Sequence, residues 1–259
     1  MMKKILIYNW KMAPGSLKEA ILLFKQTRIY VDKTRTNAEI VIAPPFVYLP
    51  LFADLGGPKR GFTRIKIAAQ NVFGGVGSAY TGEISPKMLK NLGVEYVIIG
   101  HSERRKYLNE TDEMINGKVL AALKAGLKVV LCIGEPKREL RIKNYELRMK
   151  IAKNYIRKQL TKDLKGIHNS LIVAYEPVWA IGTGKPCYPK DAAEMIKFIK
   201  RFLSVKYQAS SVKVLYGGSV DSKNIKNFVK YPEIDGVLVG GASFKKDEVE
   251  KIIMSSEKV

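Results

Sequence analysis

Eight short apolar runs recur along the chain, and segments with helical periodicity separate them. The runs, which we predict as strands, are Lys4–Tyr8, Glu39–Ala43, Ile65–Ala69, Tyr96–Ile99, Lys128–Cys132, Leu171–Tyr175, Val212–Leu215 and Gly236–Val239. The predicted helices are Leu17–Val31, Val47–Leu55, Pro86–Leu92, Thr111–Ala125, Leu140–Leu160, Ala192–Tyr207, Ser222–Val229 and Asp247–Met254. Apolar strands that alternate with helices indicate a parallel sheet with covered faces.

Eight strand–helix units in 259 residues are what one α/β fold, the (β/α)8 barrel with eight parallel strands, requires. A doubly wound open sheet is the structural alternative, because the number of strands alone does not exclude it. No linker rich in Pro, Gly or Ser divides the chain. We therefore predict a single domain over residues 1–259.

The composition indicates the class of protein. Hydrophobic residues make up 46% of the chain, enough for a large core, yet no apolar run approaches the length of a membrane span. The run Ile5–Tyr8 near the N-terminus is too short for a signal peptide. Cys132 and Cys187 lie far apart, which indicates neither a disulfide framework nor a Cys-x-x-Cys metal site. We expect a cytoplasmic enzyme without a membrane partner.

The formal net charge of +21 is high, and much of it is local. Residues 137–165 hold 11 Lys or Arg side chains against 3 acidic ones. Apolar side chains interleave at helical spacing, namely Leu147, Ile151, Tyr155, Ile156 and Leu160. We interpret the basic side chains as the solvated face of an amphipathic helix, with a polyanion or membrane-surface patch as the alternative. A positive field would also attract a small phosphorylated substrate.

Polar or Gly-rich segments follow most of the predicted strands, where a barrel carries its chemistry. They are Asn9–Met12, Gln70–Asn71 with Gly74–Gly77, Gly100–Arg105, Cys132–Glu135, Glu176, Tyr216–Val220 and Gly240–Ser243. In a barrel, Lys11, His101, Glu176 and two Gly-rich turns would therefore converge on one face.

These residue types suit proton transfer next to a carbonyl group. Such chemistry needs a carboxylate base and a donor to the carbonyl oxygen, which Glu176 and His101 can supply. Lys11 would add a fixed positive charge. The Gly-rich turns after the last two strands would offer backbone N–H groups to a phosphate. The His101-Ser102-Glu103 segment resembles the His-x-Glu of zinc deaminases, but no Pro-Cys-x-x-Cys accompanies it, so we predict no metal.

From end to end, the chain resembles the triosephosphate isomerase family. The matching segments are Asn9–Met12, Ala79–Glu83, Gly100–Arg105, Cys132–Glu135, Ala174–Lys185, Tyr216–Val220 and Gly236–Ser243. The resemblance implies a TIM barrel that interconverts dihydroxyacetone phosphate and D-glyceraldehyde 3-phosphate, a step of glycolysis and gluconeogenesis, with no cofactor.

The resemblance also implies a role for each residue at a matching position. Glu176 would be the base that moves a proton between two substrate carbons, and His101 the neutral electrophile that polarises the carbonyl. Lys11 would supply charge, Asn9 would contact a substrate oxygen, and Glu103 would position the lysine. The residues expected to bind the phosphate through their backbone are Gly182, Ser219, Gly240 and Gly241.

A homodimer is implied by the same resemblance. The loop Gly74–Glu83 would dock into the neighbouring subunit, with Thr81 approaching its active site. The chain departs from the family at Pro186, where we expect altered kinetics of loop closure, and at Tyr188, where a helix-capping Thr is usual. The functional alternative is a barrel without catalysis that binds polyanions. We do not expect nucleic acid as a partner despite the basic charge.

Overall fold

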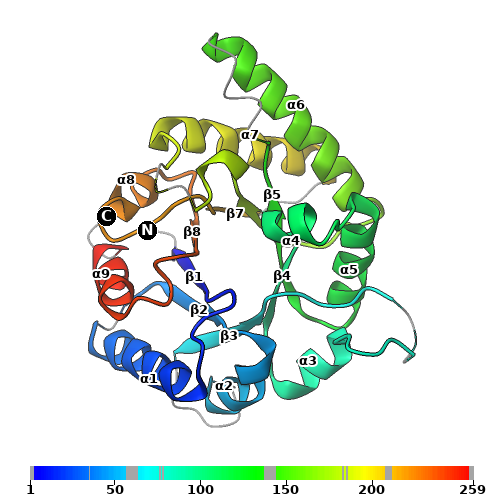
Figure 1. Ribbon diagram of the computed structural model, residues 1–259. Helices are drawn as coiled ribbons and strands as arrows, with labels where there is room; N and C mark the ends of the chain where they lie inside the picture. The colour runs from blue at the N-terminus through cyan, green and yellow to red at the C-terminus, as the bar shows by residue number, and fades with distance from the viewer. Residues whose placement is uncertain are drawn as a thin grey trace.

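The strands form one closed barrel in which all eight neighbours are parallel (Figure 1). The computed structural model describes residues 3–34, 36–56, 64–75, 77, 79–136, 144–182, 184, 186–207 and 212–256. The strands are β1 (Ile5–Asn9), β2 (Glu39–Ala43), β3 (Ile65–Ala69), β4 (Tyr96–Ile99), β5 (Lys128–Ile133), β6 (Ile172–Tyr175), β7 (Lys213–Tyr216) and β8 (Gly236–Val239). Strand β8 pairs with β1 from Ile5↔Gly236 to Tyr8↔Val239, which closes the ring. This confirms the predicted barrel and excludes the open sheet.

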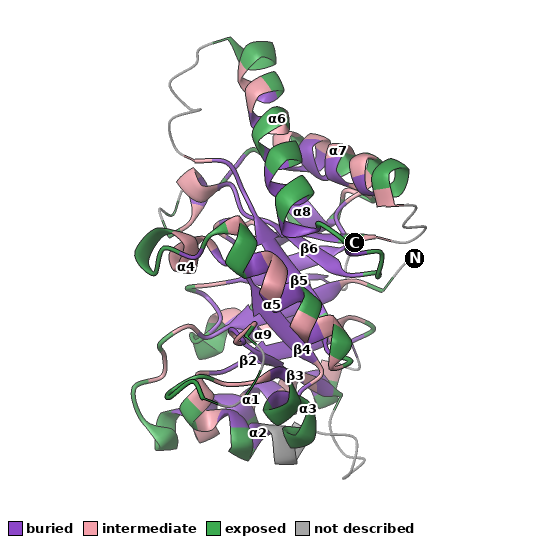
Figure 2. Cartoon of the chain, turned by 90° about the vertical axis from the view of Figure 1, so that its right-hand side faces the viewer, coloured by how far each residue is buried: buried purple, intermediate pink, exposed green. Residues whose placement is uncertain are grey.

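Helices surround the barrel, with their exposed sides turned outward (Figure 2). They are α1 (Leu17–Thr34), α2 (Leu49–Gly56), α3 (Pro86–Leu92), α4 (Ser102–Tyr107), α5 (Asp112–Lys124), α6 (Tyr145–Asp163), α7 (Pro189–Tyr207), α8 (Ile225–Val229) and α9 (Lys246–Ser256), with the 3-10 turns η1 (Phe46–Tyr48) and η4 (Val178–Ala180). Several begin at a side-chain cap of the expected type. Ser85, Thr111 and Asn144 each accept the backbone N–H three residues further on.

Successive side chains of each strand point to opposite sides of the barrel wall, as the two-residue period of a strand requires. Ile5 and Ile7 of β1 belong to the cluster inside the barrel, whereas Leu6 and Tyr8 belong to the larger cluster between barrel and helices. Both clusters are buried, which explains why the strands read as apolar along their length.

The predicted strand bounds agree with the structure to within one residue, but two helix predictions need correction. The short helix α4 was not predicted at all. In α6 the amphipathic pattern is confirmed, and Ile156 and Leu160 of the predicted apolar side are buried together with Met149 and Ala152, whereas Leu147 is 49% exposed. Predicted helical residues 140–143 lie outside the described residues. No helix in the described part of the chain has the length and apolar character needed to cross a bilayer.

Candidate active site

A cavity of about 520 Å³ lies where the carboxyl ends of the strands meet. Its lining includes eight residues singled out from the sequence, namely Asn9, Lys11, His101, Glu176, Gly182, Ser219, Gly240 and Gly241. Glu103 lies next to this group and contacts two of its members. Residues from five different strand ends are therefore brought to one site, as the barrel prediction requires.

The carboxylate of Glu176 is placed directly after β6 and is almost fully buried. The backbone N–H of Glu176 donates to the carbonyl of Ile133 at 2.7 Å, which extends the pairing of β5 and β6 beyond the strand ends. Carboxylate oxygen Oε2 accepts the backbone N–H of Ser102 at 3.1 Å. Within the described residues, Oε1 has no hydrogen-bond partner. Oε1 is thus the oxygen that is free to accept a proton.

Two glycines make room for Glu176. A Cβ added at Gly134 would lie 1.7 Å from the Glu176 carbonyl oxygen, and one at Gly217 would lie 2.8 Å from its Cγ. Any larger residue at either position would displace the carboxylate.

The imidazole of His101 faces this carboxylate from the end of β4. His101 is the N-cap residue of α4, and the backbone N–H of Glu103 donates to its Nδ1 at 3.2 Å. An amide can donate only to a ring nitrogen that carries a lone pair, so the ring is neutral with its proton on Nε2. Nε2 lies 3.5 Å from Glu176 Oε1. The site therefore presents a neutral N–H donor beside a carboxylate.

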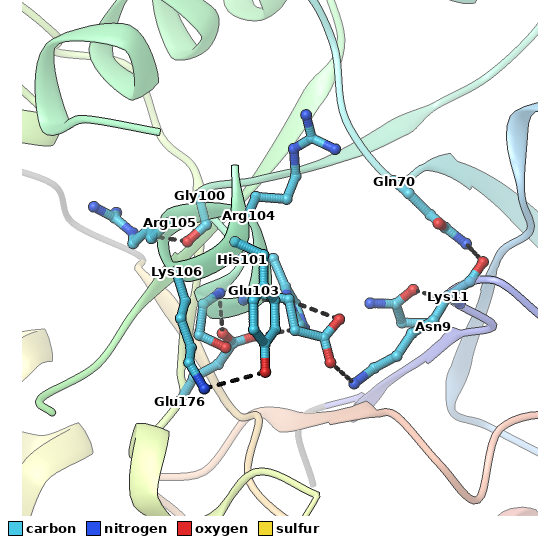
Figure 3. Close-up of polar contacts among 12 residues, drawn as sticks. Asn9, Lys11, Gln70, Gly100, His101, Glu103, Arg104, Arg105, Lys106 and Glu176 are labelled. Carbon is cyan, nitrogen blue, oxygen red and sulfur yellow. Dashed lines mark hydrogen bonds and ion pairs between the residues drawn. The ribbon is translucent and has the colours of Figure 1, made fainter. Parts of the chain in front are cut away.

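Lys11 is held in a left-handed conformation with φ of 55°, which is costly for a residue with a Cβ. Its N–H donates to Asn9 Oδ1 at 3.0 Å, and its carbonyl accepts Gln70 Nε2 at 2.9 Å. Its ammonium group binds Glu103 Oε1 at 2.5 Å, while Oε2 of Glu103 lies 3.6 Å from His101 Nδ1. Glu103 thus connects lysine and histidine (Figure 3).

The turns after β7 and β8 form one end of the cavity. Ser219 Oγ donates to the carbonyl of Ala180 at 2.6 Å, which joins the β7 turn to the segment after β6. A Cβ at Gly240 would lie 3.3 Å from Lys11 Cε, so the lysine reaches the turn after β8. Glycine backbone and an ammonium group at one place favour an anion.

Comparison with known proteins agrees with this geometry. The model of the family described as "Triosephosphate isomerase" matches residues 4–256. This chain belongs to the triosephosphate isomerase family. It is 42% identical to the triosephosphate isomerase of Caldanaerobacter subterraneus subsp. tengcongensis over 98% of this chain and 99% of that protein. Its identity to the triosephosphate isomerase of Fusobacterium nucleatum subsp. nucleatum is 43%, over 98% of each chain. The one from Thermodesulfovibrio yellowstonii is also 43% identical, over 98% of this chain and 99% of that protein.

Membership of the triosephosphate isomerase family makes the chain an isomerase.

The segment that follows Glu176 is held by hydrogen bonds at both of its ends. Trp179 Nε1 donates to Glu135 Oε1 at 3.0 Å, so the first part is tied to the end of β5. At the far end the backbone N–H of Cys187 donates to the Tyr216 hydroxyl at 3.0 Å. These contacts lie at the two ends of residues Pro177–Lys185, called the closing segment here because the family resemblance implies that it closes over substrate.

Some predicted features of this chain lie at or beyond the limits of the described residues. Thr183 and Lys185 of the closing segment lie outside them. Pro186 is exposed, as is Tyr188, whose side chain is 77% exposed and whose carbonyl accepts the N–H of Ala192 at 3.0 Å.

Several residues that line the cavity were given no role of their own in the sequence analysis. They are Ile181, Leu238, Asp221, Asn224, Phe244 and Lys245. Leu238 could have been found, because it lies at an inward-facing position of β8 near the strand end. The others depend on how the loops fold, which no local pattern shows.

Cys132 is buried inside the barrel, where it packs among apolar side chains. Burial, reinforced by the nearby charge of Glu176, raises the pKa of its thiol well above the ordinary value. Such a thiol is unreactive. In the parts of the chain that the structure describes, no group of three or more His, Cys, Asp or Glu side chains could hold a metal ion.

Proposed function

We propose that this chain interconverts dihydroxyacetone phosphate and D-glyceraldehyde 3-phosphate, with Glu176 as the base and neutral His101 as the electrophile. The observation that carries the proposal is the pair itself. A buried carboxylate with one unpaired oxygen lies 3.5 Å from an imidazole N–H in a cavity that also holds Lys11. Carbonyl-adjacent proton abstraction needs those two groups at hydrogen-bond reach of one substrate.

In the first step Glu176 Oε1 takes the proton from C2 of D-glyceraldehyde 3-phosphate. Negative charge then develops on the substrate oxygens, where His101 Nε2–H and the Lys11 ammonium group stabilise it. Asn9 contacts a substrate oxygen, and Glu103 keeps the lysine oriented through their 2.5 Å ion pair. Transfer of the hydroxyl proton from O2 to O1 and return of the carbon-bound proton to C1 then give dihydroxyacetone phosphate. No cofactor is needed, because only protons move.

The phosphate of the substrate would bind at the backbone of Gly182, Ser219, Gly240 and Gly241. All four residues line the cavity, and Lys11 lies next to one of them, Gly240. Closure of the segment from Pro177 to Lys185 would exclude water and protect the enediolate from side reactions.

Isomerisation in D2O tests this proposal. If the protonated Glu176 carboxyl group exchanges its proton with solvent, deuterium should appear on C1 of the dihydroxyacetone phosphate that forms. NMR detects it. Product without deuterium in a Glu176→Gln-sensitive reaction would show only that the proton is returned before it exchanges, whereas absence of product would contradict the function. The alternative of a catalytically inactive barrel has no observation in its favour, since the catalytic groups are assembled.

We also propose a homodimer. Met12 and Val47 expose 96% and 79% of their surface, and Tyr80, packed on Phe73 at 4.4 Å between ring centroids, exposes 46%. Thr81 is exposed and is not among the residues that line the cavity of its own chain. Its approach to an active site therefore requires a second copy. Light scattering should give twice the chain mass of 29.1 kDa, and Tyr80→Asp should lower it; a wild-type monomer would contradict the proposal.

A further inference from the structure

Arg105 binds the ends of two neighbouring strands. It lies in α4, four residues after His101, and only 17% of its side chain is exposed. Its Nε donates to the carbonyl of Gly100 at 2.8 Å, the last residue before His101 (Figure 3). Its Nη2 donates to the carbonyl of Cys132 in β5 at 3.1 Å. One guanidinium group therefore fixes the end of β4 relative to the end of β5.

Two carboxylates hold this guanidinium group from the outer side. Nη1 donates to Asp112 Oδ1 at 2.8 Å at the start of α5, and Nη2 donates to Asp163 Oδ2 at 2.5 Å at the end of α6. The Asp163 side chain is completely buried. The side chain of the neighbouring Arg104 instead donates to Glu110 at 2.6 Å. Within the described residues it makes no hydrogen bond to a strand carbonyl.

The two strand ends that Arg105 joins carry or support the reacting groups. Gly100 has φ of +74°, and a Cβ there would lie 2.9 Å from Arg105 Nη2. The peptide that leads into His101 is thus packed directly on the guanidinium group. On the other side, the chain continues from Cys132 of β5 to Gly134. Gly134 lies so close to the Glu176 backbone that a Cβ would not fit between them.

A buried ion pair adds little stability compared with apolar packing, because both charges lose their hydration. What it does add is a fixed geometry, and a planar guanidinium group with several bonds is well suited to that. Here the geometry that it fixes is the separation of β4 from β5. Glu176 is linked to the end of β5 by its bond to the Ile133 carbonyl, so that separation contributes to the 3.5 Å distance between His101 Nε2 and Glu176 Oε1.

We propose that Arg105, oriented by Asp163, is a positioning residue for the isomerisation. It acts through the backbone of Gly100 and Cys132 and does not touch the substrate. The inference rests on the proposed function, because it assigns the distance between base and electrophile to this clamp.

Kinetics of Arg105→Lys and Asp163→Asn test the proposal. Lysine keeps the charge but loses the fork, and asparagine keeps the shape but loses the charge. We expect kcat to fall about 10- to 100-fold for Arg105→Lys and about 3- to 10-fold for Asp163→Asn, in line with the cost of a misplaced reacting group. The inhibition constant of inorganic phosphate should stay within about twofold, because the turns after β7 and β8 are untouched. Arg104→Lys is the matched control and should leave kcat within about twofold.

The His101 ring offers a second readout. The chain has two histidines, so His168, which is exposed, serves as an internal reference in 15N NMR spectra. The His101 ring signals should shift in Asp163→Asn while those of His168 stay in place. This variant decides the matter if Arg105→Lys does not fold.

Three results would overturn the proposal. The first is a kcat of Asp163→Asn within twofold of wild type together with unshifted His101 signals. The second is a loss of kcat in Arg104→Lys as large as that in Arg105→Lys. The third is a loss of phosphate affinity in Arg105→Lys as large as its loss of kcat. An inactive wild-type protein would overturn the proposed function and this inference together. An active wild type with unchanged variants would overturn this inference alone.

Discussion

At the scale of single residues, the site depends on a charge network around Lys11. The ammonium group lies between the Glu103 carboxylate and the glycine turn after β8, so it can balance the charge of both phosphate and enediolate. Two hydrogen bonds hold the strained backbone of Lys11: its N–H donates to Asn9 Oδ1, and its carbonyl accepts from Gln70 Nε2. The position of this charge is therefore set by the protein before substrate binds.

Replacing Lys11 by Met is expected to lower kcat/KM by about 10²- to 10³-fold, the cost of losing one preorganised electrostatic contact. KM should rise as well, because the lysine also faces the phosphate. Glu103→Gln, which keeps the ammonium group but removes its partner charge, should cost about tenfold. Steady-state kinetics of the three proteins give the comparison. A Lys11→Met protein within a few fold of wild type would show that this charge is not part of the site.

The sequence predicted the identity of the main site residues because each belongs to a motif at a strand end. It could not predict their contacts. For example, the backbone N–H of Glu103 donates to His101 Nδ1, which leaves the ring proton on Nε2. This contact depends on α4, a six-residue helix that is too short to show periodicity in the sequence. The clamp of Arg105 on Gly100 and Cys132 joins residues of two strands, which no local pattern reveals.

At the scale of elements, the closing segment has an unusual second hinge. Pro186 precedes Cys187, whose N–H is fixed on the Tyr216 hydroxyl of β7. Proline holds its own φ near −65° and restricts the residue before it, so this hinge has fewer backbone conformations than one without proline.

Pro186→Ala is expected to speed loop opening by about two- to threefold, because the alanine backbone is less restricted. Fluorine-labelled tryptophan would report it by NMR, with Trp179 in the segment as the probe and the buried Trp10 as reference. Pro232→Ala, far along the chain in an exposed position, is the control. An unchanged opening rate together with an unchanged kcat would rule out a kinetic role for Pro186.

The opposite ends of β2, β3 and β4 carry an ionic cluster. Glu39 binds Lys66 at 3.0 Å and accepts the hydroxyl of Tyr96. Burial raises the pKa of Glu39, but the hydrogen bonds from Tyr96 and Lys66 outweigh it and hold the pKa below its ordinary value. The ionised carboxylate thus links three strands at the N-terminal end of the barrel.

This shift predicts a pH-dependent contribution to stability. A lowered carboxyl pKa stabilises the fold above the unfolded-state value of about 4.3, and the gain is lost as pH falls through the lower folded-state value. Glu39→Gln should therefore cost about 1–3 kcal/mol in the free energy of unfolding near pH 7 and progressively less below about pH 4. Urea denaturation at several pH values measures it. Glu95→Gln is the control and should destabilise the fold less, because the ion pairs of Glu95 are longer, at 3.5–3.6 Å. A loss of stability in Glu39→Gln that grows as the pH falls would contradict the lowered pKa of Glu39.

Strand positions could be predicted because buried parallel strands read as short apolar runs. Helix bounds were less predictable, since caps and tertiary packing set them. In α6 the exposed Leu147 lies near the helix start, where the hydrophobic pattern alone suggested burial.

At the scale of the whole molecule, we expect the net charge of +21 to affect how fast the substrate is encountered. A positive field attracts a phosphorylated triose, and salt screens it over about 10 Å at 0.1 M. We expect kcat/KM to fall about three- to tenfold between low and physiological ionic strength, with kcat nearly constant. Kinetics in sodium chloride at fixed pH measure this. A flat response would show that the charge plays no part in capture of the substrate.

The assembly of chains could not be predicted from periodicity or composition. It rests on the family resemblance and on exposed apolar side chains such as Met12, whose exposure only the folded chain shows. The eight alternating strand–helix units, in contrast, could be read from the sequence, although only the pairing of β8 with β1 excluded an open sheet.

The central claim is that Glu176 is the base of a triosephosphate isomerase. Isomerisation of D-glyceraldehyde 3-phosphate by the wild-type protein and by Glu176→Gln tests it most directly. We predict fast turnover for wild type and a kcat lower by about 10²- to 10⁴-fold for the variant, which keeps the shape of the side chain but cannot accept the proton. A folded wild-type protein without turnover, or a variant as active as wild type, would contradict the account.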